Sequence, residues 1–338
     1  IFEILAPYYG DVPKSHYLLA SRRAFNNASI RCEDDILESL EDAFLTGSPK
    51  SILQSRFGVA WSSESDEACL AAGFKNGDSL CDYENDEVRA KLKVFLLAQQ
   101  VAIFSQSKNE RTALGEYLDQ TMSVGRKSAV VDIGHSGSLQ KSLLRLTGDA
   151  NIGGFYFLTF NKASLVHTAS TPVRGWLAEF IDPSRECIDY CRNIGMFEFL
   201  FLNEEESLSH FEFDEASGSA APVYVGEPVG DRQKQVSLVH GGIDKFTRDL
   251  VDCLGAELVG FCLERDVATR AMMEFVRNPS RADAEIVSNV LFFDGYAGGA
   301  THHLVEPNRV EALQSLSNFG DYIDKSWWKP GALSLLIQ

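Results

Sequence analysis

The feature that most constrains the fold is a strand–turn–helix–strand run in the middle of the chain. Residues 127–134 form an apolar strand that ends in an acid and a glycine. A helix over 136–146 and an aromatic-rich strand over 152–160 are expected to follow. Two strands joined by a crossover helix form a β-α-β unit, in which the strands are parallel. The run therefore predicts an α/β fold, with helices flanking a parallel sheet.

The turn after the first strand has the composition of an anion-binding loop. Gly134 and Gly137 allow the backbone to approach a ligand closely, and Ser136 and Ser138 add hydroxyl donors. The first amides of the next helix have no intrahelical acceptor, and the positive end of the helix dipole lies behind them. Such a turn can bind phosphate without a lysine, and Asp132 before it can accept from ribose hydroxyls or hold a divalent cation.

The plainer alternative is that glycine and serine only end the strand and cap the helix. The turn contains neither the Gly-Lys-Ser/Thr of a P-loop nor a complete G-x-G-x-x-G pattern. Basic residues near it in the sequence can supply a positive field, although solvated surface charge is their default role. These residues are Arg111, Arg126, Lys127, Lys141 and Arg145.

The remainder of the chain is predicted to be mostly helical and to form one unit with the β-α-β run. The predicted helices cover 33–45, 49–53, 86–105, 109–122, 183–190, 235–254, 268–277 and 282–290, and the short predicted strands cover 15–20 and 223–225. We treat 1–338 as a single α/β unit with a sub-boundary near 217–222, the best linker candidate. Because the chain starts with Ile1 in a predicted helix, we expect a fragment of a longer protein.

Charge and cysteine content exclude several classes of protein. With 48 acidic and 31 basic residues, the net charge is −17, which argues against a nucleic-acid-binding or a broadly basic membrane-binding face. No apolar run is long enough for a direct membrane span. The seven cysteines form no C-x-x-C motif, so we expect reduced thiols, a cytoplasmic protein and no metal site. His302, His303 and Glu306 form only a weak candidate for metal ligands.

The strand, the single acid and the small-residue loop resemble the glycan phosphoribosyltransferase module of bacterial ribofuranosyltransferases. These modules usually accompany a haloacid-dehalogenase-like (HAD-like) phosphatase in polysaccharide gene clusters. The resemblance implies a divergent phosphoribosyltransferase fold, Rossmann-like, with extensive additional helices. His135 stands where the family usually has a tryptophan. The segments that carry the resemblance are 17–24, 132–140, 154–157, 197–200 and 326–331.

The resemblance implies a glycosyltransferase that moves a phosphoribosyl group from 5-phosphoribosyl 1-diphosphate to a sugar hydroxyl of a capsule or O-antigen glycan. Asp132 would face the ribose, Arg22 and Arg23 would bind the diphosphate, and Ser21 and Gln140 would contact substrate. The residues implied for the 5-phosphate are Gly134, His135, Ser136, Gly137 and Ser138.

Inversion at the ribose C1 would give a β-ribofuranoside and needs a general base for the acceptor hydroxyl. Glu198 is the first candidate and Asp132 the second, while a surface role for Glu198 remains the alternative. The single acid before the loop does not decide whether a cofactor is required, and Mg²⁺ is the candidate.

A separate HAD-like phosphatase would remove the 5-phosphate, since this chain has no D-x-D motif. The enzyme would work in the bacterial cytoplasm, and assembly partners could bring it to the inner membrane. Two other functions stay open: a non-catalytic phospho-sugar or nucleotide-binding module of a polysaccharide-assembly protein, and an accessory domain of a HAD-like phosphatase.

Overall fold

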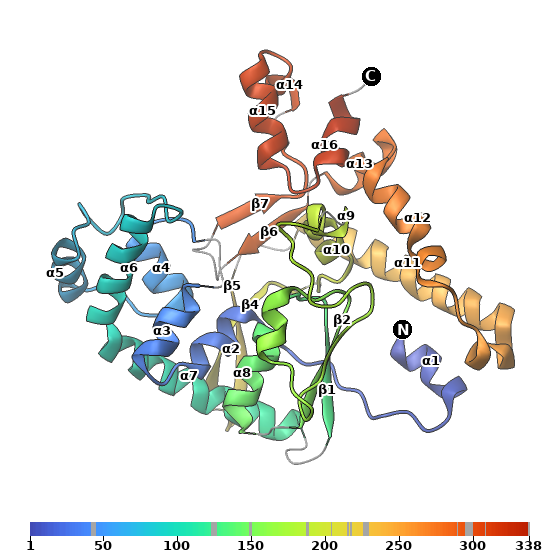
Figure 1. Cartoon of the computed structure of the whole chain (residues 1–338), viewed down its shortest axis with the longest axis horizontal. Helices are drawn as coiled ribbons and strands as arrows, with labels where there is room; N and C mark the ends of the chain where they lie inside the picture. Colours follow the sequence, from blue (N-terminus) through green and yellow to red (C-terminus); the bar gives the residue numbers. More distant parts are fainter. Residues whose placement is uncertain are drawn as a thin grey trace.

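The fold was analysed in a computed structural model of the chain. It describes residues 1–338 except 42–44, 123–126, 149–150, 187–188, 204, 215, 217, 226–229, 289, 295–299, 308 and 337–338. In Figure 1 a group of N-terminal helices lies on one side, the helices of the C-terminal third lie on the other, and a small sheet lies between them. None of the described helices is both long and apolar enough to cross a bilayer.

The central sheet is parallel, as the β-α-β run predicts. It contains β1 (Ser128–Asp132), β2 (Ile152–Tyr156) and β3 (Val173–Gly175), in that order across the sheet. Helix α8 (Ser138–Thr147) connects β1 to β2. The predicted α/β class is therefore confirmed, although the sheet has only three strands within the described part of the chain.

Helix α8 is fixed to the sheet by a buried glutamine. Gln140 donates from Nε2 to the carbonyl of Ile152 at 2.9 Å and accepts from the Tyr156 hydroxyl at 2.9 Å. A side chain at Gly154 would overlap both Gln140 and the Tyr156 ring, so only glycine allows this close packing. The start of α8 is thus held at the carboxyl end of β1.

The N-terminal helices form a layer with its own apolar core. They are α2 (Arg22–Ser29), α3 (Glu33–Ser39), α4 (Pro49–Phe57), α5 (Ser63–Ala71), α6 (Asp86–Ala98) and α7 (Gln100–Thr121), and α1 (Phe2–Tyr9) precedes them. Pro49 opens α4, as predicted, and the Ser48 side chain caps it. The largest fully buried side chains of this core include Phe57, Phe95, Ile36, Leu40 and Ile52.

Four predicted elements in the first half of the chain are wrong in detail. The helix predicted over 33–45 ends at Ser39, with 42–44 outside the described residues. The helices predicted over 86–105 and 109–122 meet instead at Gln99, whose buried side chain accepts from Ser65 Oγ at 3.0 Å. Residues 15–20 form no strand, because the Leu19 amide donates to the Tyr117 hydroxyl rather than to a sheet.

The second half contains an antiparallel hairpin and a largely helical C-terminal part. The hairpin pairs β4 (Ser207–Asp214) with β5 (Ser219–Val225), so most of the linker candidate 217–222 lies in a strand. The helix predicted over 183–190 is replaced by a turn at 183–185 and a short helix from Asp189, with 187–188 outside the described residues. His240, Gly241 and Gly242 lie inside the helix predicted over 235–254.

The other helices predicted in the C-terminal third are confirmed within a few residues. Trp328 is fully buried there and donates from Nε1 to the Val276 carbonyl at 2.9 Å, which joins the last helix to the core. The elements are η1 (Asn161–Leu165), α9 (Asp189–Arg192), α10 (Ile194–Leu200), α11 (Gly230–Leu254), η2 (Gly255–Gly260), α12 (Arg265–Arg277), α13 (Arg281–Val287), β6 (Leu291–Asp294), β7 (Ala300–His303), α14 (Arg309–Ala312), α15 (Leu316–Lys325) and α16 (Lys329–Leu336).

Candidate functional site

The loop between β1 and α8 is shaped by Asp132 and two glycines. Asp132 Oδ1 accepts from the Gly134 amide at 2.9 Å, and a Cβ atom on Gly134 would lie 2.8 Å from the other carboxylate oxygen. Gly137 has φ +68° and is the N-cap residue of α8, where it contributes no side-chain cap. Ser136 and Ser138 are partly exposed on the loop. The first turn of α8 therefore starts behind a small, uncapped loop, the geometry that favours an anion.

His135 turns inward from the loop and is held on two sides. Its ring stacks on Phe160 at 4.9 Å between centroids, and its Nε2 lies 2.9 Å from the Tyr190 hydroxyl. Burial, together with the nearby positive charge of Arg22, lowers the pKa of His135 to about 4. The ring is therefore neutral at pH 7, and it forms a wall of the loop rather than a cationic phosphate ligand.

The pKa of Asp132 reflects both its burial and the charge of Arg22. Burial raises the pKa of Asp132, while the Gly134 amide and the Arg22 charge act in the opposite direction. Arg22 is exposed and is the first residue of α2, directly after the N-cap Ser21. The Asp132 carboxylate before the uncapped start of α8 is thus within electrostatic range of the Arg22 guanidinium.

Arg23 points away from this loop, in contrast to the predicted diphosphate contact. It is 5% exposed, and its two terminal nitrogens donate to the Glu110 carboxylate at 2.6 and 2.8 Å. Its Nε donates to the Ser55 carbonyl at 2.8 Å. Adjacent helix positions face different directions, so α2 places Arg22 at the loop and Arg23 in the helical layer.

Two further predicted substrate contacts have structural roles instead. Gln140 is fully buried, and its amide nitrogen and oxygen are both used between α8 and β2. The Ser21 hydroxyl accepts from the Ala24 amide at 3.0 Å as the cap of α2. Ser21 therefore fixes the start of the helix that carries Arg22.

Glu198 lies on α10 and is linked electrostatically to the loop through Tyr190. Its side chain is partly exposed between the buried Phe197 and Phe199. Burial raises the pKa of Tyr190 most, and the negative charges of Glu198 and Asp132 raise it further. Tyr190 is thus within electrostatic range of both predicted base candidates.

Tyr190 is the residue at this site that the sequence does not reveal. It is fully buried, and its ring lies 4.4 Å from that of Phe197 and 5.0 Å from that of Phe157. Its partner His135 is 55 residues away in the sequence, so no local pattern connects the two. The one available signal was the concentration of aromatic residues in the second strand and in 197–201.

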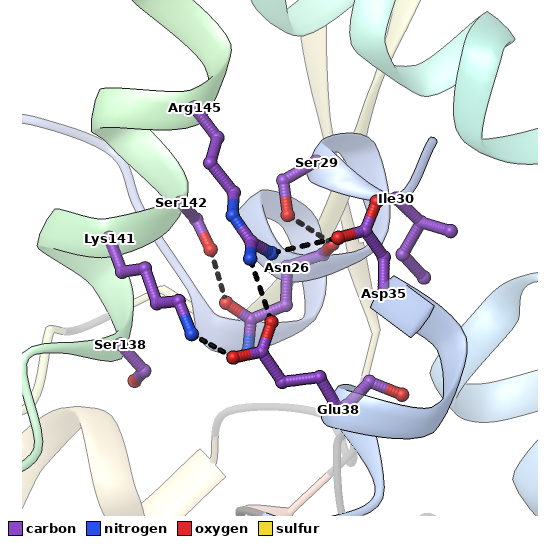
Figure 2. A pocket seen from close by; sticks show the side chains of 10 residues that line it. Asn26, Ser29, Ile30, Asp35, Glu38, Ser138, Lys141, Ser142 and Arg145 are labelled. Atoms are coloured by element: carbon purple, nitrogen blue, oxygen red, sulfur yellow. Dashed lines mark hydrogen bonds and ion pairs between the residues drawn. The ribbon is translucent and has the colours of Figure 1, made fainter. Parts of the chain in front are cut away.

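A small polar pocket lies behind the loop, between α2, α3 and α8 (Figure 2). Figure 2 shows Lys141 and Arg145 of α8 directed at Glu38. Arg145 also pairs with Asp35 at 3.1 Å. The pocket is lined by Asn26, Ser29, Ile30, Asp35, Glu38, Ser39, Ser138, Lys141, Ser142 and Arg145.

These ion pairs change the role predicted for the nearby basic residues. Lys141 and Arg145 are paired with acids, and Arg111 donates to the carbonyls of Ala28 and Ile30 at the end of α2. Arg126 lies outside the described residues. Among the described cations, it is Arg22, predicted for the diphosphate, whose charge acts on the pKa of Asp132.

Within the described residues, no three His, Cys, Asp or Glu side chains gather as metal ligands. The side chain of His302 is not among those described, so the His302–His303 candidate is untested. At the loop, Asp132 is the acid that could contribute to binding a cation together with a substrate phosphate. Neither the protein-family models nor the curated proteins compared with this chain match it.

Proposed function

We propose that this chain transfers a 5-phosphoribosyl group from 5-phosphoribosyl 1-diphosphate to a sugar hydroxyl of a bacterial surface glycan. The observation that carries the proposal is the arrangement at the end of β1. There the Asp132 carboxylate precedes an uncapped helix start and lies within electrostatic range of the Arg22 guanidinium. A phosphate, a ribose and a diphosphate each need one of these three groups.

The donor is held in three parts. The 5-phosphate binds the loop 134–138 and the first turn of α8, where backbone amides and the helix dipole favour a dianion. Asp132 accepts hydrogen bonds from the ribose hydroxyls. Arg22 pairs with the diphosphate, whose negative charge grows as the bond to C1 breaks. With one acid at the loop, any Mg²⁺ would be bound largely by donor oxygens and water.

The acceptor hydroxyl loses its proton late in the reaction, as C1 takes on oxocarbenium character. Glu198 and Asp132 are the candidate bases. Burial raises the pKa of Asp132, which suits proton transfer near neutral pH. The charge of Glu198 acts on Tyr190, whose hydroxyl lies 2.9 Å from Nε2 of the loop residue His135, so Glu198 serves as the base if the acceptor enters from the side of α10. The product is a β-ribofuranoside, whose 5-phosphate a HAD-like phosphatase would remove.

A second candidate is a non-catalytic phospho-sugar-binding module of a polysaccharide-assembly protein. The ion pair of Arg23 with Glu110 favours it, because this pair leaves a single arginine for a diphosphate that carries several charges. Such a module would bind ribose 5-phosphate through the same loop without turning over the donor.

Donor turnover separates the two candidates. The full-length protein is incubated with 5-phosphoribosyl 1-diphosphate, Mg²⁺ and synthetic glycan acceptors, and mass spectrometry follows the gain of one phosphoribosyl group. Asp132→Ala should abolish the product, whereas Asp266→Asn, at an exposed acid of α12, should leave it unchanged. Thermal stabilisation by ribose 5-phosphate without any product would favour the binding module.

A further inference from the structure

One face of the central sheet is exposed to solvent. On the face toward α8, Ile152 and Tyr156 of β2 are buried, and the Tyr156 hydroxyl donates to Gln140 of that helix. Val131 of β1 and Phe155 of β2 point to the opposite face, because side chains alternate along a strand. These two residues are 88% and 51% exposed. The sheet is therefore packed against α8 on one side and open to water on the other.

The exposed residues are neighbours across the three strands. Val131 is in register with Phe155, and Phe155 is in register with Arg174 of β3. Residues in register on adjacent parallel strands lie about 5 Å apart and share a face of the sheet. Ala129, two positions before Val131 in β1, is exposed as well. The open face thus presents a continuous row of aliphatic, aromatic and guanidinium groups.

An open face of this composition is uncommon in a parallel sheet. Parallel sheets are normally covered on both faces, because their connections place helices on each side. Leaving the side chains of Val131 and Phe155 in water forgoes the free energy of burying them. Aromatic and arginine side chains are also enriched in the contacts between proteins. The face therefore has the composition of a surface that another protein chain covers.

The charged groups beside this face are complementary to one another. The side chain of Arg174 is 61% exposed, and its Nη1 lies 3.7 Å from Glu179 Oε2. Since a strong hydrogen bond between such groups is about 2.7–2.9 Å long, the pair within one chain is loose. Glu179 Oε1 accepts from the Gly175 amide at 3.1 Å, which holds the carboxylate beside β3. A surface that carries both charges side by side can pair with a second copy of itself.

We propose that the open face of the sheet is the interface of a symmetric homodimer. A two-fold axis through the face buries Val131 and Phe155 of both copies and brings Arg174 of each copy toward Glu179 of the other. The net charge of −17 on each chain opposes association, so salt that screens this repulsion should favour the dimer. The inference concerns the face opposite α8 and does not rest on the proposed function.

The test measures the oligomeric state of the full chain by sedimentation velocity, from micromolar to hundreds of micromolar protein. We expect an equilibrium between monomer and dimer. Phe155→Thr should weaken the dimer about tenfold or more, as the loss of a central aromatic contact does. Val131→Thr should weaken it about threefold or more. Both changes keep a residue that favours a strand. Val101→Thr, at an 80% exposed valine of α7, is the matched control and should leave association unchanged.

A charge exchange tests the two-fold arrangement. Arg174→Glu leaves only acids at this edge of the face, and Glu179→Arg leaves only arginines, so each variant alone should self-associate about threefold more weakly or less. A mixture of the two variants places opposite charges across the interface again. The mixture should therefore associate more tightly than either variant alone.

The inference is upheld by a dimer that Phe155→Thr weakens, that Val101→Thr leaves unchanged and that the mixture of charge variants restores. A chain that stays monomeric over the whole concentration range overturns it. A dimer that persists unchanged in Phe155→Thr and Val131→Thr, with circular dichroism showing both to be folded, overturns it too, because association then uses another surface. A mixture that associates no better than its components overturns the two-fold arrangement.

Discussion

Two adjacent arginines at the start of α2 belong to two polar regions that differ in how their polar groups are paired. Arg23 enters a closed network in which Asn27 and Gln106 also donate to the Glu110 carboxylate, at 2.8 and 2.9 Å. Arg22 instead faces the loop of Asp132, where the start of α8 has no side-chain cap. In the first region the polar groups hydrogen-bond to one another, and this pairing stabilises the fold. In the second region the uncapped start of α8 offers donors to a ligand.

The electrostatics of the two regions differ in the same way. Burial acts to raise the pKa of Glu110, but hydrogen bonds from Arg23, Asn27 and Gln106 outweigh it and lower the pKa below its usual value. At Asp132 the balance is reversed, since burial prevails over the amides of Gly134 and Ile133 and the charge of Arg22. A buried carboxylate with enough hydrogen-bond donors and positive charge around it stabilises the fold. A buried carboxylate with too few of them is stabilised most when a ligand binds to it.

The largest predicted effect comes from breaking the closed network. Glu110→Ala leaves the Arg23 charge buried without its carboxylate and should lower the free energy of unfolding by about 3–5 kcal/mol. Urea denaturation at pH 7 measures this. The control is Arg270→Ala, which removes an exposed arginine of α12 and should cost less than about 0.5 kcal/mol.

The double variant Arg23→Leu/Glu110→Leu sharpens this prediction. Replacing both partners by apolar side chains removes the unpaired charge, so most of the stability lost in Glu110→Ala should return. A cost below about 1 kcal/mol for Glu110→Ala would show that the network is not closed in solution.

The next effect concerns the open region and depends on pH. The pKa of His135 falls from 6.5 to about 4 on folding, so the unfolded chain takes up a proton that the folded chain does not. The stability contributed by this histidine is complete above pH 6.5 and is lost as the pH falls to about 4. The loss should reach about 3 kcal/mol. Urea denaturation from pH 7.5 to 4 should therefore show a shallower decline for His135→Gln than for the unchanged protein.

The sequence predicts those parts of this contrast in which the interacting residues are close together along the chain. The strand, Asp132, the glycine turn and α8 are contiguous, so residue type and spacing predict them. Arg22 and Arg23 cannot be distinguished in this way, because their directions depend on where α2 begins. Ser21 sets that start by capping the Ala24 amide.

The long-range contacts are beyond what local patterns can predict. The bond between His135 and Tyr190 joins residues 55 positions apart, and the pair of Arg23 and Glu110 joins residues 87 apart. Likewise, Gln99 separates α6 from α7 through Ser65, 34 residues earlier. Each of these contacts exists only once the helices have packed.

Glycine substitutions test the loop with a smaller effect. Gly137→Ala forces a side chain into a left-handed conformation, φ +68°, and should destabilise the protein by about 1–2 kcal/mol while weakening ribose 5-phosphate binding. Gly241→Ala is the matched control, because Gly241 lies exposed inside α11 with no atom near its Cβ position. That change should stabilise the protein by up to about 1 kcal/mol. Effects of the same sign would contradict the assignment of Gly137 to a constrained turn.

The smallest predicted effect tests whether Tyr190 positions His135. Tyr190→Phe keeps the buried ring but removes the hydroxyl 2.9 Å from Nε2, and should cost about 1 kcal/mol. Tyr322→Phe is the comparison, since that buried hydroxyl has only a 3.5 Å bond to the Ala332 carbonyl and should matter less. The ¹⁵N chemical shifts of the His135 ring report its tautomer directly. A shift change in Tyr190→Phe and none in Tyr322→Phe would show that a neutral histidine at the open loop is oriented from the core. Unchanged shifts in both would mean that stacking on Phe160 alone holds the ring.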